Sequence, residues 1–346
     1  MRQTIFLFLF LVLALMVRGQ EQQYKVACIG FYNFENLFDT LDTPDKFDEE
    51  FTPQGTRLWD GEKYSEKLHN LARVVSELGT DLTPDGPALL GVAEIENRQV
   101  LEDFVREPAI AKRGYEIIHY ESPDRRGIDV ALLYQPKYFT PLGSHPVRLN
   151  IKNENGDTVY TREILYVTGL LDGDTLHVLV NHWPSRRGGE KATRPLRNAA
   201  AMLNKNVRDS LIARNPAAKI IVMGDLNDDP TSPSVAKVLL AKPKKNQLRK
   251  GDFFNPWHAF YKRGIGTLAY RDAWSLFDQI LITEGLVNPE NPGYHFYKAK
   301  VFNPTYLVQK TGQYKGYPFR TFDFDNYIHG YSDHFPVCIY LLKPLD

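Results

Sequence analysis

Short apolar runs alternate along the chain with polar segments rich in glycine and proline, and they predict strands and helices in mixed order. Continuous apolar runs predict strands at residues 24–32, 88–93, 115–120, 130–134, 164–171, 175–180, 220–223, 277–282 and 337–342. Apolar residues at helical spacing predict helices at 64–78, 100–105 and 194–214. Because strands outnumber helices, and hairpins mix with helical crossovers, we expect an α/β or α+β fold with large mixed sheets.

The N-terminal segment has the pattern of a targeting signal. Arg2 gives a positive start, residues 5–17 are apolar and uncharged, and Arg18 ends the run. This run is shorter than the roughly 20 residues that a membrane span requires. We therefore expect a signal peptide over residues 1–20, export to the periplasm or the medium, and no stable membrane anchor. Residues 21–346 show neither a repeat nor a composition break, so we expect one domain, and a monomer.

Basic and acidic side chains balance, with 42 Lys and Arg residues against 42 Asp and Glu residues. A net charge of zero argues against a protein that coats nucleic acid non-specifically, but it is compatible with a local basic pocket for one phosphate. Cys28 and Cys338 both lie in apolar runs. We interpret them as buried small side chains, although export would also permit a disulfide between them.

Polar residues gather where predicted strands begin or end. Rigid strands position such side chains well, so this arrangement is typical of a functional site. The strand-end candidates are Asn33, Glu94, His182, Asp225, Asn227, Asp333 and His334. Asp278 lies inside an otherwise apolar run, and a buried carboxylate requires a partner. We expect His334 to be that partner.

The candidate set is rich in oxygen ligands and contains no cysteine. Carboxylate and amide oxygens suit hard cations, so Mg²⁺, Mn²⁺ or Ca²⁺ fits better than Zn²⁺. A hard cation held by one or two carboxylates typically assists chemistry at phosphate. A His–Asp pair can supply the base, while His and Asn side chains can contact the phosphoryl oxygens.

The order of these residues resembles that of the endonuclease/exonuclease/phosphatase superfamily, which includes deoxyribonuclease I, abasic-site endonucleases, sphingomyelinases and inositol polyphosphate 5-phosphatases. The landmarks are an early Asn, a Glu that ends a strand, a His segment, Gly-Asp-x-Asn, a strand Asp and Ser-Asp-His. They occur here in that order, from Asn33 to His334. The resemblance implies a deoxyribonuclease I-like, four-layer α/β sandwich of two packed mixed sheets flanked by helices.

The resemblance also implies a metal site. Glu94 would be the main ligand, and Asn33 and Asp333 would complete the metal environment. Here Ala93 precedes the Glu where Gln is commoner, and this leaves Glu96 as a neighbouring alternative. Alternation along a strand would place both glutamates on one face. We place Glu94 first, because it directly follows the apolar run.

Catalytic roles follow from the same resemblance. His334 would activate water and Asp278 would orient it. Asp225 would align the nucleophile or assist the leaving group, while Asn227 and His182 would bind phosphoryl oxygens. Members of the superfamily differ in the true base and in the number of metals, so both points stay open.

Three arginines in neighbouring loops are candidates for binding substrate phosphate, because the guanidinium fork matches its geometry. They are Arg126, Arg186 and Arg187. Asp129 is a candidate for holding Arg126 or His182 in place. We interpret the basic, aromatic segment 242–261 as a mobile surface loop, with contact to a nucleic acid strand as the alternative.

These observations predict an exported, metal-dependent phosphodiesterase, endonuclease-like and acting on nucleic acid. A phospholipid, phosphoinositide or nucleotide phosphohydrolase is the second hypothesis. Such a lipid enzyme needs an exposed apolar loop, for which Phe253–Phe254 and residues 294–297 are weak candidates. An inactive binding module is a third hypothesis, which the complete set from Glu94 to His334 disfavours.

Overall fold

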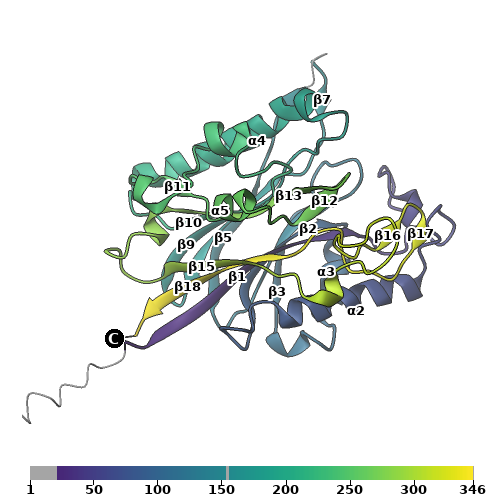
Figure 1. Cartoon of the computed structure of the whole chain (residues 1–346), viewed down its shortest axis with the longest axis horizontal. Helices are drawn as coiled ribbons and strands as arrows, with labels where there is room; N and C mark the ends of the chain where they lie inside the picture. The colour runs from purple at the N-terminus through teal and green to yellow at the C-terminus, as the bar shows by residue number, and fades with distance from the viewer. Residues whose placement is uncertain (1–21, 153–155, 346) are drawn as a thin grey trace, which may run out of the picture.

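Two six-stranded β-sheets lie face to face between outer layers of helices (Figure 1). The computed structural model describes residues 22–152 and 156–345, so the signal peptide predicted over residues 1–20 lies outside the described residues. The predicted four-layer α/β sandwich is confirmed.

The first sheet is built around β1, which runs from the start of the described chain to the centre of the molecule. In spatial order its strands are β15 (His295–Val301), β18 (Val337–Pro344), β1 (Tyr24–Leu37), β2 (Pro87–Ile95), β4 (Asp129–Tyr134) and β3 (Glu116–His119). β1 pairs with β2 in parallel and with β18 antiparallel. Residues 27–34 of β1 are all buried. A continuous apolar run is expected for a strand covered on both faces.

The second sheet has the same mixed character. In spatial order its strands are β11 (Phe253–Phe254), β14 (Asp278–Thr283), β10 (Ile220–Asp225), β9 (Asp174–His182), β8 (Ile164–Leu171) and β5 (Phe139–Val147). β9 and β10 pair in parallel, and β10 pairs with β14 antiparallel. The predicted hairpin of β8 and β9 is confirmed; Asp172 and Gly173 form its turn, both with positive φ.

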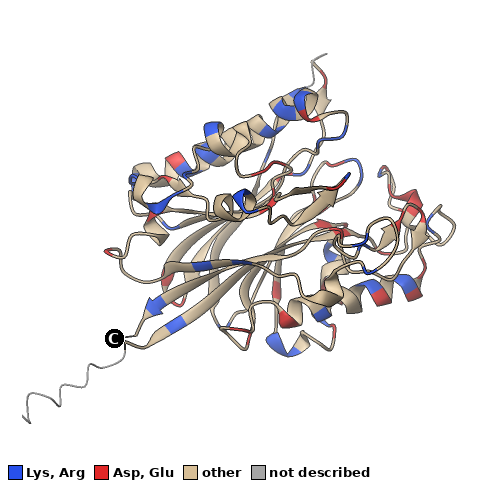
Figure 2. Ribbon diagram, in the orientation of Figure 1, with Lys and Arg blue, Asp and Glu red and all other residues tan. Residues whose placement is uncertain are grey.

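Helices cover the outer faces of both sheets. They are α2 (Gly61–Glu77), α3 (Arg98–Val105), α4 (Glu190–Arg214) and the short α5 (Trp257–Lys262). The Asp60 side chain caps α2 by accepting the Lys63 N–H, and the buried face of α2 includes Leu68, Leu71 and Val75. Figure 2 shows both signs of charge on α2 and α4, whereas the strands between them are mostly uncharged.

Three small hairpins complete the fold: β6 (Ile151–Lys152) with β7 (Thr158–Val159), β12 (Leu268–Tyr270) with β13 (Ala273–Ser275), and β16 (Phe322–Asp323) with β17 (Asn326–Tyr327). The last packs on a separate cluster of buried side chains near α2, formed by Phe38, Phe51, Trp59, Ile128 and Phe322. Phe51 and Trp59 of this cluster anchor the acidic segment 39–60 to the rest of the fold.

One prediction about a segment was wrong. Residues 242–261 are not a mobile surface loop, because they contain β11 and α5, and both Phe253 and Trp257 are fully buried. The apolar side chains that suggested a contact surface fill the core instead. Phe254 is also buried, and of residues 294–297 Tyr294 is buried while Tyr297 is 53% exposed, so both segments remain weak candidates for a membrane loop, as the sequence indicates.

The sequence pattern missed β5 and β15, which are both edge strands. β5 contains Pro141 and Pro146, and proline is tolerated at a sheet edge where its missing N–H costs no ladder bond. Cys28 and Cys338 are buried and free, as the interpretation as small apolar side chains predicts. Among the described residues, no helix is both long and apolar enough to cross a bilayer.

Candidate active site

Strand register in the second sheet places three candidate side chains in one row. Asp225, at the end of β10, pairs with His182 on β9 on one side and with Asp278 on β14 on the other. All three residues are buried. Residues far apart in sequence therefore meet at the end of adjacent strands, as the strand-end pattern predicted.

The first sheet brings its candidates to the same place. Asn33 on β1 pairs with Ala93 on β2, directly before Glu94. The loop that enters β18 is tied to β1, because Ser332 Oγ donates to the Asn33 carbonyl oxygen at 2.7 Å and accepts the His334 N–H at 3.1 Å. These two hydrogen bonds hold the backbone of His334 next to Asn33 of β1.

Glu94, His182 and Asp225 form a compact group at the junction of the sheets. His182 Nε2 lies 3.7 Å from Glu94 Oε1 and 3.7 Å from Asp225 Oδ2, and one ligand atom from each of the three lies within 4.8 Å of the others. Asn33 Nδ2 donates to Asp225 Oδ2 at 3.2 Å, and the Asn36 N–H donates to Glu94 Oε2 at 3.1 Å. The backbone of Asn36 thus helps to orient Glu94.

Backbone geometry separates Glu94 from Glu96. Glu94 has a φ of 59°, and the β2–β4 pairing is irregular between Ala93 and Ile95. The alternation of side chains between the two faces of the strand is lost there, so Glu94 and Glu96 have different surroundings. Glu96 accepts hydrogen bonds from the Asp39 N–H and Thr43 Oγ1, and thereby holds the 39–60 segment rather than the His182 group.

His334 and Asp278 form the predicted pair. His334 Nδ1 lies 2.7 Å from Asp278 Oδ2, and His334 Nε2 lies 3.9 Å from Asp225 Oδ2. Burial alone would lower the pKa of His334, but the charge and hydrogen bond of Asp278 raise that pKa well above its ordinary value. Asp278 thus directs the other ring nitrogen, Nε2, toward Asp225.

The two remaining buried groups have pKa values shifted in opposite directions. Burial, with help from Arg162, Arg126 and His334, lowers the pKa of His182 well below its ordinary value. Burial raises the pKa of Asp225 to about 7, and the nearby carboxylates of Asp278 and Glu94 act in the same direction. His182 is therefore neutral near pH 7, whereas Asp225 exchanges a proton there.

Gly224 and Asn227 shape the loop that carries Asp225. A Cβ on Gly224 would lie 2.1 Å from the carbonyl oxygen of Asn181, so only glycine permits this approach of β10 to β9. Asn227 has a φ of 49°, which Asn tolerates better than most residues. Its N–H donates to Asp225 Oδ1 at 2.9 Å and its Nδ2 donates to the Trp183 carbonyl oxygen at 2.9 Å.

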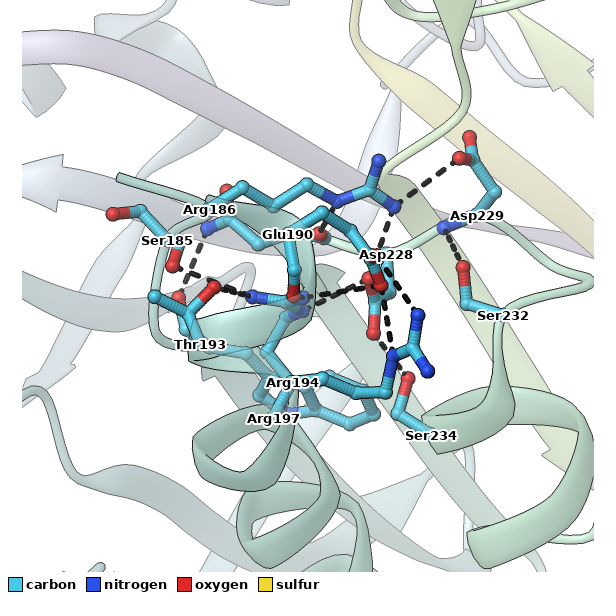
Figure 3. Close-up of polar contacts among 12 residues, drawn as sticks. Ser185, Arg186, Glu190, Thr193, Arg194, Arg197, Asp228, Asp229, Ser232 and Ser234 are labelled. Carbon is cyan, nitrogen blue, oxygen red and sulfur yellow. Dashed lines mark hydrogen bonds and ion pairs between the residues drawn. The ribbon is translucent and has the colours of Figure 1, made fainter. Parts of the chain in front are cut away.

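Arg186 is engaged within the protein. Its Nε donates to the Asn227 carbonyl oxygen at 2.9 Å, and one terminal nitrogen contacts Asp228 at 2.9 Å and Asp229 at 3.3 Å. Figure 3 shows Arg186 and Arg197 converging on Asp228, which is fully buried and pairs with Arg197 Nε at 2.9 Å. These contacts brace the Asn227 loop, and the predicted contact of Arg186 with substrate stays a prediction.

Arg126 and Arg187, the other two arginines predicted to bind phosphate, are more exposed than Arg186. Arg126 Nε lies 3.9 Å from Asp124 Oδ1, its side chain is 43% exposed, and its charge reaches His182. Arg187 is exposed, and its backbone N–H donates to Ser185 Oγ. The prediction that Asp129 holds Arg126 or His182 was wrong: Asp129 Oδ2 lies 3.1 Å from His119 Nε2 on the neighbouring strand β3, at the sheet edge.

Sequence reasoning missed several long side chains that hold the site together. Arg162 is buried, pairs with Asp124 at 3.0 Å, and donates to the carbonyl oxygens of His182 and Trp183. Arg320 Nη2 lies 3.0 Å from Asp333 Oδ2, and Asp333 Oδ1 lies 3.8 Å from His334 Nε2.

A fully buried lysine supports the end of β1. Lys67 Nζ lies 3.7 Å from Glu35 Oε2 and donates to Thr321 Oγ1 and, at 2.9 Å, to the Tyr331 carbonyl oxygen. Lys67 lies four residues before Leu71 on the apolar face of the predicted helix. A lysine at such a position is a sequence signal of a buried, partnered charge.

The site fits a hard divalent cation. Glu94 and Asp225 place negative charge beside Asp278, and burial, together with these neighbouring carboxylates, raises the pKa of Asp225. Oxygen donors with one histidine suit Mg²⁺ or Mn²⁺. Glu94 would be the main ligand of the ion, and Asp225 and His182 lie beside it. Asn33 and Asp333 stay predicted ligands, because Asn33 Oδ1 accepts the Glu35 N–H and Asp333 pairs with Arg320.

Comparison with known proteins agrees with this geometry. The profile of the Endonuclease/Exonuclease/phosphatase family matches residues 28–343, which is almost the whole described chain. The chain belongs to this family. It is thereby a member of a superfamily of phosphoesterases that generally depend on divalent metals. No curated protein matches the sequence.

Solved structures of this family share the fold at low identity. A humanized D. rerio TDP2 is 14% identical, with a TM-score of 0.54 over 91% of this chain and 98% of its own. A family protein from Bacteroides thetaiotaomicron is 17% identical, with a TM-score of 0.54 over 94% and 100%. A mannosyl-6-phosphatase from B. thetaiotaomicron VPI-5482 is 17% identical, with a TM-score of 0.54 over 91% and 99%.

Proposed function

We propose that this family member is an exported, divalent-metal-dependent phosphodiesterase that acts on nucleic acid. One observation carries the proposal: the His334–Asp278 pair and the group of Glu94 and His182 both lie close to Asp225. Base, cation ligands and oxyanion contacts thus converge on one point, which phosphoryl hydrolysis requires.

In the proposed hydrolysis, each residue of the site has a separate role. His334 Nε2 accepts a proton from the attacking water, while Asp278 holds Nδ1 at 2.7 Å and stabilises the imidazolium that forms. Asp225, whose pKa is raised to about 7, donates a proton to the leaving oxygen. Neutral His182 contacts a phosphoryl oxygen. A bound divalent cation would neutralise charge on the phosphate and the leaving oxygen.

Hydrolysis of three substrates by the protein after residue 20 tests the proposal. We expect cleavage of plasmid DNA, of a single-stranded oligonucleotide and of bis(p-nitrophenyl) phosphate with Mg²⁺ or Mn²⁺, and none with EDTA. Glu94→Ala and His334→Ala should abolish all three activities. His329→Ala is the matched control, because His329 is exposed and pairs with Glu66.

Other outcomes would change the assignment. Hydrolysis of p-nitrophenyl phosphate or mannose 6-phosphate without any diester cleavage would make the protein a phosphomonoesterase. Cleavage of phospholipid vesicles but not of nucleic acid would favour the lipid hypothesis. No hydrolysis of any substrate would favour a binding module.

A further inference from the structure

A pocket of about 240 Å³ opens directly beside the proposed site, and no step above uses it. Its walls come from the end of β1, from the segment before α2 and from the β16–β17 hairpin with the chain that leads into it. In Figure 1 this hairpin lies beside α2, at the side of the molecule away from the C-terminus. We name it the Arg57–Arg320 pocket, after its two cationic side chains.

This pocket shares its walls with the site. Asn36 lines the pocket, and its N–H holds Glu94 at 3.1 Å. Arg320 also lines it and pairs at 3.0 Å with Asp333, whose other oxygen lies 3.8 Å from His334 Nε2. A group seated in the pocket therefore adjoins a phosphate placed between Glu94 and His334.

The guanidinium groups in the pocket lie over aromatic rings. The Arg57 guanidinium lies 4.5 Å from the ring centroid of Phe322, and that of Arg320 lies 5.1 Å from the ring centroid of Tyr314. Arg57 is fixed by Glu50 and by the carbonyl oxygen of Phe324, both at 2.9 Å. The pocket thus presents preformed planar surfaces with positive charge.

Phe324 stands out at the rim of the pocket. Its side chain is 75% exposed, and its φ is 51°. A bulky residue in the left-handed region carries a conformational cost. The exposed ring adds no packing to the fold, whereas Phe322, two residues earlier, is buried in the cluster near α2. A contact with ligand explains a phenyl ring at this place.

We propose that the Arg57–Arg320 pocket binds the nucleobase next to the phosphate that is cleaved, with the base stacked on Phe324; this rests on the proposed action on nucleic acid. Aromatic rings and guanidinium planes favour a flat π-system over a sugar ring. Binding of sugar hydroxyls would call for a free carboxylate. The carboxylate in the pocket, Glu35, is already engaged by Lys67 and by the Thr321 N–H.

Equilibrium binding tests this inference without any turnover. Calorimetry in the His334→Ala background, with Mg²⁺, compares adenosine and thymidine 5′-monophosphates with ribose 5-phosphate. We expect both nucleotides to bind at least about tenfold more tightly than the sugar phosphate, since one stacked base contributes that much. Phe324→Ala should remove most of this preference, and Arg57→Ala should reduce it.

Tyr297→Ala is the matched control, because Tyr297 is 53% exposed on the edge strand β15 and does not line the pocket. It should leave the preference unchanged. Circular dichroism verifies that each variant is folded. Equal affinity for all three ligands, or an equal loss for ribose 5-phosphate in Phe324→Ala, would overturn the inference. Plasmid cleavage is scored separately, so failure of the proposed function is distinguishable from failure of the pocket.

Discussion

Two groups of histidine and carboxylate residues occur in the described chain, and their contrast shows what makes one of them a reaction site. Glu94, His182 and Asp225 form one, and His119, Glu121 and Asp129 form the other. The second lies at a sheet edge, where His119 and Asp129 pair directly at 3.1 Å and Asp129 also accepts the Ser122 N–H. Asp129 is therefore already engaged by contacts within the fold.

The first group is arranged differently. His182 stays 3.7 Å from both carboxylates, and within the described residues its buried Nδ1 has no hydrogen-bond partner. Unsatisfied buried groups are costly, and under the proposed function a cation and a substrate would complete the contacts of this group. Similar residue types would then serve structure at one place and chemistry at the other.

Removing one carboxylate from each group gives the largest expected difference. Glu94→Ala should lower kcat/KM for bis(p-nitrophenyl) phosphate by about 10³-fold, because it removes a cation ligand at the reacting phosphate. Glu121→Ala should change it less than about twofold. Steady-state kinetics of the two variants tests the contrast, and equal losses would refute it.

The Asp278 carboxylate gives the next largest effect. Asp278→Asn should lower kcat by about 10²-fold, because His334 loses the group that orients it and stabilises its charge. Asp278 raises the pKa of His334, and the base works only when Nε2 is unprotonated. The acidic limb of the pH–rate profile should therefore move to lower pH in this variant. A limb that stays in place or moves upward would assign the base to another group.

Arg186 and Arg187 offer a smaller, matched comparison. Arg186→Ala should lower kcat by about tenfold, since the Asn227 loop loses its brace, and KM should change little. Arg187→Ala should alter neither parameter if Arg187 is only a solvated side chain. A rise in KM for both variants would instead support the sequence-based prediction that the two contact the substrate.

For the second group, formed by His119, Glu121 and Asp129, we expect a substitution to affect stability but not activity. His119→Ala should lower the free energy of unfolding by about 1–3 kcal/mol, because it leaves the buried Asp129 carboxylate with less compensation. kcat/KM should equal that of the parent protein. Urea denaturation together with steady-state kinetics measures both quantities, and a loss of activity without a loss of stability would give the second group a function.

Local sequence signals were enough to identify several of the candidate site residues. Asp225 and His334 could be found because each sits directly beside an apolar strand, and Asp278 because a charge interrupts one. Their spatial partners could not be found in the same way. Lys67 meets Thr321 across 254 residues, and Arg162 acts on the backbone of His182 from a polar segment with no periodic pattern. Glu94 and Glu96 differ by a backbone angle that spacing alone does not reveal.

The fold could be predicted where strands are central and continuous in apolar residues, as in β1, β10 and β18. Two edge strands, β5 and β15, could not be predicted, since an edge strand needs only one paired side and tolerates proline or polar residues. The error over segment 242–261 has the opposite cause. The lysines of this segment suggested exposure to solvent, but the side chains of Phe253 and Trp257 are fully buried and anchor the segment to the core.

The pairing of β1 with β18 sets the order in which this protein can become active during its synthesis. β1 is the first described strand and β18 the last, and they pair from Tyr24 with Pro344 to Phe31 with Val337. β15 also pairs with β18, and His334 lies in the loop that leads into it. Such long-range pairing closes late, because the intervening chain must first exist. A chain still in synthesis therefore cannot bring His334 to Asn33 and Asp278 until its last strand has docked.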